Sequence, residues 1–175
     1  MDEKLKYPIG KYELQPFSED LKNTLLQKME HLPNDLERAI QDLDEAQLQT
    51  PYRDGGWTVQ QVVHHIADAD LNLYIRVKKA LTENNPSVFS YAQNAWAELA
   101  DVKIVHPQIS VDLIKALNVR LLMLFNSLNK EDWNKTVYQS EMKSQLSVWE
   151  LLGKYVWHNK HHTAHITTLR KRMGW

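Results

Sequence analysis

Six of the eight histidines fall in two short stretches of the 175-residue sequence. His64 and His65 are adjacent in VVHHIADAD, and four more occupy positions 158, 161, 162 and 165 in WHNKHHTAH. Residues four apart on a helix project from the same side, with Cβ atoms about 6 Å apart, so two imidazoles at this spacing can chelate one ion. The pair at 158 and 162 and the pair at 161 and 165 both meet this condition. The clustering therefore indicates a metal site.

Helical phase distinguishes some of these histidines. In the segment that begins at Thr58, the apolar stripe is centred near Val62 and Ile66, with His65 at its edge and His64 nearly opposite. We therefore expect His65 to face a cavity of the fold and His64 to face water. On the last segment, phase alone does not decide between the two pairs of histidines spaced four residues apart.

A polar row lies beside the same apolar stripe and consists of Gln61, Asp68 and Asn72. Polar side chains that line a cavity are costly unless they bind something. Asp68, one helical turn from His65, could orient a ligand imidazole or accept a proton. An ordinary solvated acid on a helix is an equally good interpretation of Asp68.

The donor set constrains the metal chemistry, because the chain has no cysteine and any metal must be bound by His, Asp or Glu. Three neutral imidazoles without a thiolate are typical of a catalytic zinc site, where a fourth position stays open. Nickel, cobalt and manganese fit imidazole as well. The open position predicts either an activated water or an ionised substrate thiol.

Four segments with helical apolar spacing must position these residues. They run from Ser18 to about Leu43, from Thr58 to Leu81, from Ser110 to Leu128 and from Ser147 to Gly174. Capping boxes mark two of the starts, since Gln61 and Glu150 each follow a Thr or Ser by three residues. We predict an all-α, four-helix bundle with a long crossover, from about 83 to 107, between the second and third helices. Residues 136–139 could form a short extended piece.

Composition limits the remaining possibilities. A chain of 175 residues with 43% hydrophobic residues predicts a single domain, 1–175. Its formal net charge of −1 gives no field that favours nucleic acid or a membrane surface. No signal peptide, membrane-length apolar run or phosphate-binding glycine motif is present, so we expect a cytoplasmic protein. We expect the isolated His31 and His106 to lie on the surface.

Three segments resemble the DinB-like superfamily, and specifically its YfiT group of metal-dependent hydrolases. They are YPIGKY at 7–12, TPYRDGGWTVQQVVHHIADAD at 50–70 and YVWHNKHHTAHITTLRKRMGW at 155–175. The likeness spans nearly the whole chain. It implies a four-helix bundle, and because homodimers are common in the family, it also implies a homodimer. It further implies a metal bound by the second histidine of the HH pair and by both histidines of HxxxH. Carried over by position, the implied ligands are His65, His161 and His165.

We therefore expect a metal-dependent hydrolase that acts on a small-molecule substrate. It would bind one divalent metal per chain, with zinc expected before other metals, and this metal would activate a water. The superfamily is also similar to the mycothiol- and bacillithiol-dependent transferases. A low-molecular-weight thiol S-transferase is therefore the main alternative. The second alternative is a metal-binding stress protein without catalytic activity.

Overall fold

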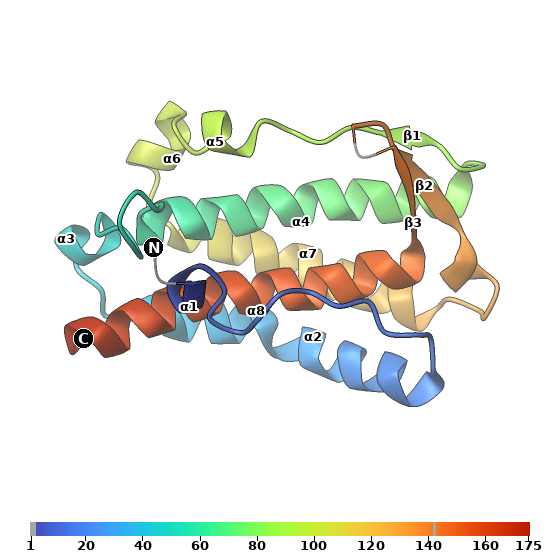
Figure 1. The fold of residues 1–175 in the computed structure, drawn as a ribbon, viewed down its shortest axis with the longest axis horizontal. Coiled ribbons are helices and arrows are strands. Elements are labelled where there is room, and N and C mark those ends of the chain that lie inside the picture. Colours follow the sequence, from blue (N-terminus) through green and yellow to red (C-terminus); the bar gives the residue numbers. More distant parts are fainter. Residues whose placement is uncertain (1–2, 142) are drawn as a thin grey trace.

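The computed structural model describes residues 3–141 and 143–175, and four long helices form its body (Figure 1). They are α2 (Glu19–Ile40), α4 (Val59–Thr82), α7 (Gln108–Asn126) and α8 (Val148–Met173). Helices α2 and α4 each pack against both α7 and α8. This arrangement confirms the predicted four-helix bundle.

Local capping explains where most of these helices begin. The hydroxyl of Ser18 accepts a hydrogen bond from the backbone of α2, and both predicted capping boxes, at Thr58 and at Ser147, are formed. Helix α8 ends at Gly174, whose φ of 75° lies in the left-handed region that suits glycine. The start predicted at Ser110 was wrong by two residues, because α7 already begins after Pro107, whose fixed φ suits a first turn.

Two clusters of buried apolar side chains fill the bundle. The first lies where α8 begins and includes Phe125, Trp133 and Leu152. The second lies toward the opposite end and includes Ile66 and Ile166. A buried polar layer also joins α4, α7 and α8, with members Asp70, Asn118, Tyr155 and Asn159.

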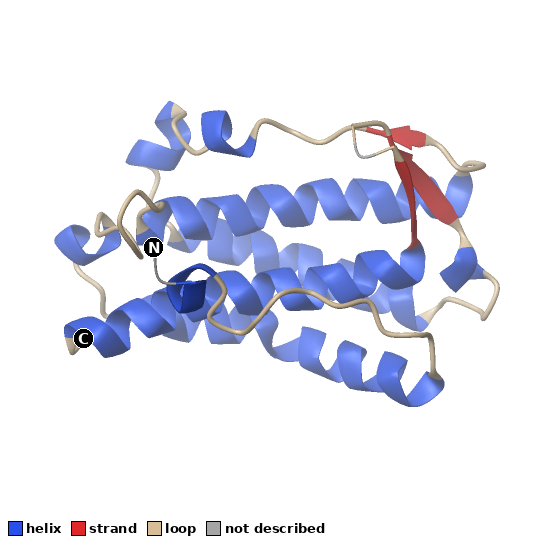
Figure 2. Ribbon diagram, in the orientation of Figure 1, coloured by secondary structure: helices blue, strands red, loops and turns tan. Residues whose placement is uncertain are grey.

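The predicted long crossover between α4 and α7 runs along α4 and contains short elements (Figure 1). These are strand β1 (Ser87–Val88) and helices α5 (Gln93–Trp96) and α6 (Ala100–Ile104). Strand β2 (Thr136–Gln139) is the extended piece expected from the sequence, and it pairs with β3 (Ser144–Ser147) in antiparallel fashion and with β1 in parallel fashion. Figure 2 shows this small sheet at one end of the bundle.

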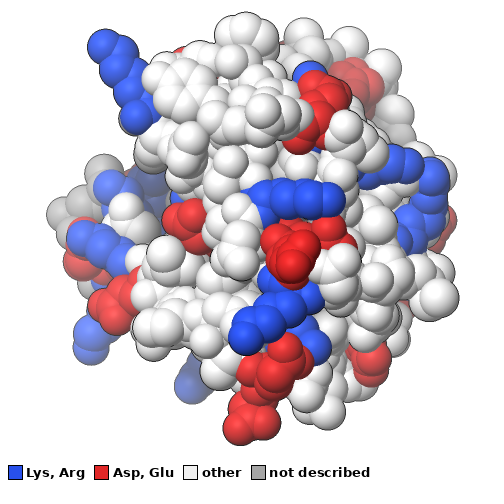
Figure 3. Space-filling model, turned by 90° about the vertical axis from the view of Figure 1, so that its right-hand side faces the viewer, with Lys and Arg blue, Asp and Glu red and all other residues white. Residues whose placement is uncertain are grey.

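The remaining short helices are α1 (Glu3–Lys6), α3 (Glu45–Leu48) and the 3₁₀ helix η1 (Asp132–Asn134). The N-terminal segment follows α8, where the Trp149 indole N–H donates to the Gln15 carbonyl at 2.8 Å. Within the described ranges, no helix is both long and apolar enough to cross a membrane. On the face shown in Figure 3, acidic and basic side chains are interspersed, as the near-zero net charge predicts.

Candidate metal centre

The antiparallel neighbours α4 and α8 bring the two histidine stretches together. His65 lies on α4, and its ring centroid is 5.1 Å from that of His158 and 4.8 Å from that of His162, both on α8. The rings of His158 and His162 are 4.4 Å apart, as expected for positions one helical turn apart. Three imidazoles from two helices therefore face one another.

The nitrogen atoms of these three rings converge as metal ligands do. The Nε2 atoms of His65 and His158 are 3.2 Å apart, and one ring nitrogen from each of His65, His158 and His162 lies within 4.8 Å of the others. Two zinc–nitrogen bonds of 2.0–2.1 Å at a tetrahedral angle place their nitrogens about 3.3 Å apart. No other trio of His, Asp or Glu side chains in the described part of the chain brings its ligand atoms this close together. The donor set fits one divalent ion.

The other predicted pair, His161 and His165, occupies the neighbouring wall. The His161 ring stacks on Trp157 at 4.5 Å, and the His165 ring stacks on Tyr52 at 4.0 Å. The Nε2 atom of His165 is also 3.2 Å from the Lys6 carbonyl oxygen. Both side chains line one cavity together with the three converging histidines, but their ring nitrogens do not join that cluster. The assignment implied by resemblance stays a prediction. The pair that sequence spacing left open, at 158 and 162, has the better geometry.

Burial keeps the three converging imidazoles neutral. It lowers the pKa of His65 to about 4. The pKa of His158 is lowered to about 3, mainly by burial and also by the charges of nearby histidines. Burial, followed by the charges of four neighbouring histidines, also holds the pKa of His162 well below its usual value. Metal ligation requires the neutral form of histidine, so the site is in its ligand-competent state at neutral pH.

His64 is buried, and the expectation that it faces water was wrong. Its Nδ1 lies 2.7 Å from the Ser110 hydroxyl and its Nε2 lies 3.0 Å from the Val105 carbonyl oxygen. The N-terminal end of α7 and the segment before it cover this side of α4, which helical phase alone could not reveal. Both ring nitrogens are occupied, so His64 is not available as a ligand. His31 and His106 are exposed, as predicted.

Two cavities meet at His65 and His158, and the first of them also reaches His162. The first, here called the N-terminal cavity, has a volume of about 460 Å³ and includes Tyr7, Tyr52 and Trp57 in its wall. The second, here called the Arg76 cavity, has a volume of about 530 Å³ and lies between α4, α8 and the crossover. Both are lined by His65 and His158. A ligand at the metal position could therefore be approached from two sides.

Tyr91 is a contact to the site that the sequence analysis missed. Its hydroxyl oxygen lies 3.3 Å from Nδ1 of His65, the nitrogen opposite the one that faces His158. Hydrogen bonds to the outer nitrogen of a ligand histidine fix its tautomer and ring orientation. Tyr91 lies in the long crossover, and the length of this connection was the only sequence signal that pointed to functional residues there.

The two acids of α4 near the site differ in position. Asp68, the predicted proton acceptor, lines neither cavity, and its carboxylate makes no hydrogen bond within the described residues. Burial and the charge of Asp101 raise its pKa to about 6. Its catalytic role stays a prediction. Asp70 lines the Arg76 cavity, accepts a hydrogen bond from Asn159 at 2.9 Å, and has its pKa raised to about 8 by burial.

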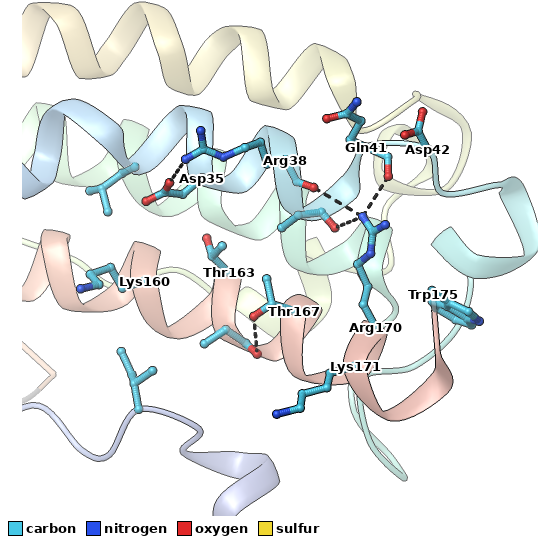
Figure 4. Close-up of a pocket in the computed structure, with 14 residues that line it drawn as sticks. Asp35, Arg38, Gln41, Asp42, Lys160, Thr163, Thr167, Arg170, Lys171 and Trp175 are labelled. Atoms are coloured by element: carbon cyan, nitrogen blue, oxygen red, sulfur yellow. Dashed lines mark hydrogen bonds and ion pairs between the residues drawn. The ribbon is translucent and has the colours of Figure 1, made fainter.

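A further cavity of about 750 Å³ lies on the other side of α8, between α8 and α2 (Figure 4). Three of its charged side chains, Asp35, Arg38 and Arg170, are engaged by the protein itself. Arg170 donates to the carbonyl oxygens of Arg38, Ala39 and Gln41 at the end of α2, and the Arg38 side chain pairs with Asp35. No histidine lines this cavity. Arg170 therefore caps the end of α2, and this cavity is separate from the candidate metal centre.

Comparisons with known proteins agree with this geometry. Over 98% of both chains, the protein is 48% identical to a Bacillus cereus (strain ATCC 10987 / NRS 248) protein and 47% identical to one from Bacillus thuringiensis subsp. konkukian (strain 97-27). Both relatives carry the name "Putative metal-dependent hydrolase". The structure matches YfiT from Bacillus subtilis, described as a probable metal-dependent hydrolase with an unusual four-helix bundle topology, with a TM-score of 0.96 at 43% identity. That match covers 98% of this chain and 99% of YfiT. A family model for the DinB superfamily matches residues 19–166, and the chain belongs to this superfamily.

Proposed function

We propose that the protein is a metal-dependent hydrolase in which His65, His158 and His162 bind one divalent metal, with zinc the first choice. The observation that carries this proposal is the 3.2 Å approach of two facing Nε2 atoms, with a third histidine nitrogen within 4.8 Å of both. The names of the relatives support a metal-dependent hydrolase. Nickel, cobalt and manganese suit the same ligands.

The side chains supply what such a reaction needs around the metal. A zinc ion held by His65, His158 and His162 would keep one coordination position open and would supply an acidified water there. Tyr91 holds the His65 ring from its outer nitrogen, and the aromatic ring of Trp57 packs against His65 at 4.6 Å. Asp68 lines neither cavity but lies one helical turn from His65; with a pKa of about 6 it is mostly ionised at neutral pH, and it is the proposed proton acceptor.

An assay of the zinc-loaded protein against a panel of esters and amides tests this function. Hydrolysis should depend on the loaded metal and disappear in His158→Ala. It should persist in Lys160→Gln, whose exposed side chain lies on α8 away from both cavities. The rate should rise with pH as the bound water ionises. Absence of hydrolysis across the panel, with metal fully bound, would contradict the proposal.

Thiol S-transfer is the second candidate, and the two cavities favour it. Because the N-terminal cavity and the Arg76 cavity meet at His65 and His158, a thiol and its electrophile could enter from different sides. The sulfur would form a bond to the electrophilic carbon as the bond from that carbon to its leaving group, or to the epoxide oxygen, breaks. The thiol proton would end on the leaving group or on the opened epoxide oxygen. Activity confined to thiols paired with aryl or epoxide electrophiles would support transfer over hydrolysis. Inactivity in both panels would support a non-catalytic metal-binding protein.

Homodimer formation is a further proposal, and it rests on the resemblance to the superfamily. Light scattering of the purified chain tests it, since a dimer doubles the mass of the 20.5 kDa protomer. A monomer at micromolar concentration would contradict it.

A further inference from the structure

We propose that the Arg76 cavity binds a carboxylate of the substrate, with Arg76 and Lys154 as its cationic contacts, while the reacting bond lies at the histidine trio. This inference rests on the proposed metal centre and adds the substrate class, a small molecule with a carboxylate remote from the reacting bond. The cavity is lined by residues of α4, α8, the crossover and the sheet, among them Asn72, Arg76, Tyr91, Gln139, Lys154 and His158.

Arg76 is a half-buried cation that makes no ion pair among the described residues. Its Nη2 donates to the Phe89 carbonyl oxygen at 2.8 Å, and no carboxylate of the described residues lies within 4.0 Å of the guanidinium. Glu141 acts on it only through longer-range charge, and the Glu141 carboxylate accepts a hydrogen bond from the Ser90 backbone. A guanidinium has five N–H donors and binds a planar carboxylate in bidentate fashion, so most of its donors remain for a ligand.

Lys154 adds a second positive charge to the same cavity. It is half-buried, and its ammonium group has no hydrogen-bond or ion-pair partner within the described residues. Among the described residues that line the cavity, Asp70 is the one acid; it is buried, and burial raises its pKa to about 8. Asp70 is therefore mostly neutral at pH 7, and the cavity carries two positive charges with no negative charge of its own.

The two cations lie in the same direction from the metal centre. Arg76 follows His65 by three turns of α4, about 16 Å along the axis, and its long side chain can reach back along the cavity. Lys154 precedes His158 by one turn of the antiparallel α8, about 6 Å along the axis. The 530 Å³ cavity is continuous from His65 and His158 to both cations. An extended molecule with its reacting group at one end and a carboxylate at the other fits this arrangement.

Hydroxamates of graded length test the inference on the zinc-loaded protein by isothermal titration calorimetry. One series consists of the monohydroxamates of the straight dicarboxylic acids from glutaric to suberic acid. The matched series ends in a carboxamide instead of the carboxylate. At the best length, we expect the carboxylate to bind at least about tenfold tighter than the carboxamide, the lower range for charge-assisted hydrogen bonds. Salt should reduce this preference.

Three variants locate the effect. Arg76→Gln and Lys154→Gln should each remove most of the preference for the carboxylate. Lys160→Gln, which makes the same charge change on the exposed side of α8, should keep it. Because Arg76 also holds the Phe89 carbonyl, Arg76→Gln could disturb the crossover, and Lys154→Gln avoids that difficulty. Equal affinity for carboxylate and carboxamide at every length would overturn the inference and leave the metal centre standing.

A second measurement separates the carboxylate site from the metal. Glutarate, titrated into ¹⁵N-labelled protein without added metal, should saturably shift the Arg76 Nε–Hε resonance, whereas glutaramide should not. If neither hydroxamate series binds the zinc-loaded protein, the open metal position is refuted. The glutarate titration then decides the carboxylate site alone: a saturable shift supports it, and no shift overturns it.

Discussion

Replacement of the buried Asp70 by asparagine should make the protein more stable, and increasingly so at higher pH. The Asp70 side chain is 1% exposed, and burial raises its pKa from 3.8 to about 8. The folded state therefore keeps a proton that the unfolded state releases above about pH 4. Because the unfolded state then binds fewer protons, Asp70 lowers the free energy of unfolding progressively as pH rises from about 4 to about 8.

The magnitude follows from the width of this window. Each pKa unit corresponds to about 1.4 kcal/mol, so the Asp70 contribution should change by roughly 3–4 kcal/mol between pH 5 and pH 8. Asparagine has the same shape and no charge, and its amide oxygen can still accept the hydrogen bond from Asn159. The advantage of Asp70→Asn over the wild type should therefore grow by about that amount across the same interval.

Urea unfolding of both proteins at several pH values, in the presence of a chelator, measures this difference. The buried histidines have lowered pKa values, so they contribute stability above pH 6.5 that is lost as pH falls. This trend opposes that of Asp70, but it is common to both proteins and cancels in their difference. A difference in unfolding free energy that stays constant from pH 5 to pH 8 would refute the assignment of a neutral, buried carboxyl at position 70.

Three further predictions concern the metal centre and the core. Tyr91→Phe should weaken metal binding by about tenfold or more, because the outer nitrogen of His65 loses its partner, and competition with a chelator measures the change. Wild-type metal affinity should hold down to about pH 5 and fall near pH 4, because burial holds the pKa of His65 at about 4; a loss centred on pH 6.5 would contradict the burial of this ligand. Ile166→Ala should lower the free energy of unfolding by about 2–5 kcal/mol, since the side chain is fully buried in the core, and denaturant unfolding tests this; a loss below 1 kcal/mol would show that the site is loosely packed.

Features that depend on neighbouring residues in the chain could be predicted from the sequence. The capping boxes at Thr58 and Ser147 combine short-range hydrogen bonds with an apolar helical period, and both helices begin where these signals place them. The extended piece at 136–139 was also found as strand β2. Strands β1 and β3 were not expected, because a two-residue strand and the polar segment SQLS carry no alternating pattern.

Features that depend on how helices meet could not be predicted from the sequence. His64 looked solvent-facing because phase was judged against one helix, while the start of α7 covers its far side. The choice between His158/His162 and His161/His165 depends on the rotation of α8 relative to α4, since one residue corresponds to about 100°. Tyr91 reaches His65 from a crossover whose path depends on tertiary packing.

The metal content of four matched histidine variants of α8, measured by elemental analysis after zinc loading and dialysis, distinguishes the two candidate ligand pairs. His158→Ala and His162→Ala should lose the ion, whereas His161→Ala and His165→Ala should retain about one zinc per chain, because only the first pair converges with His65. Retention by His64→Ala, whose ring nitrogens are already hydrogen-bonded, serves as the control on α4. Loss of zinc from His161→Ala and His165→Ala, with retention in His158→Ala and His162→Ala, would contradict the proposed centre.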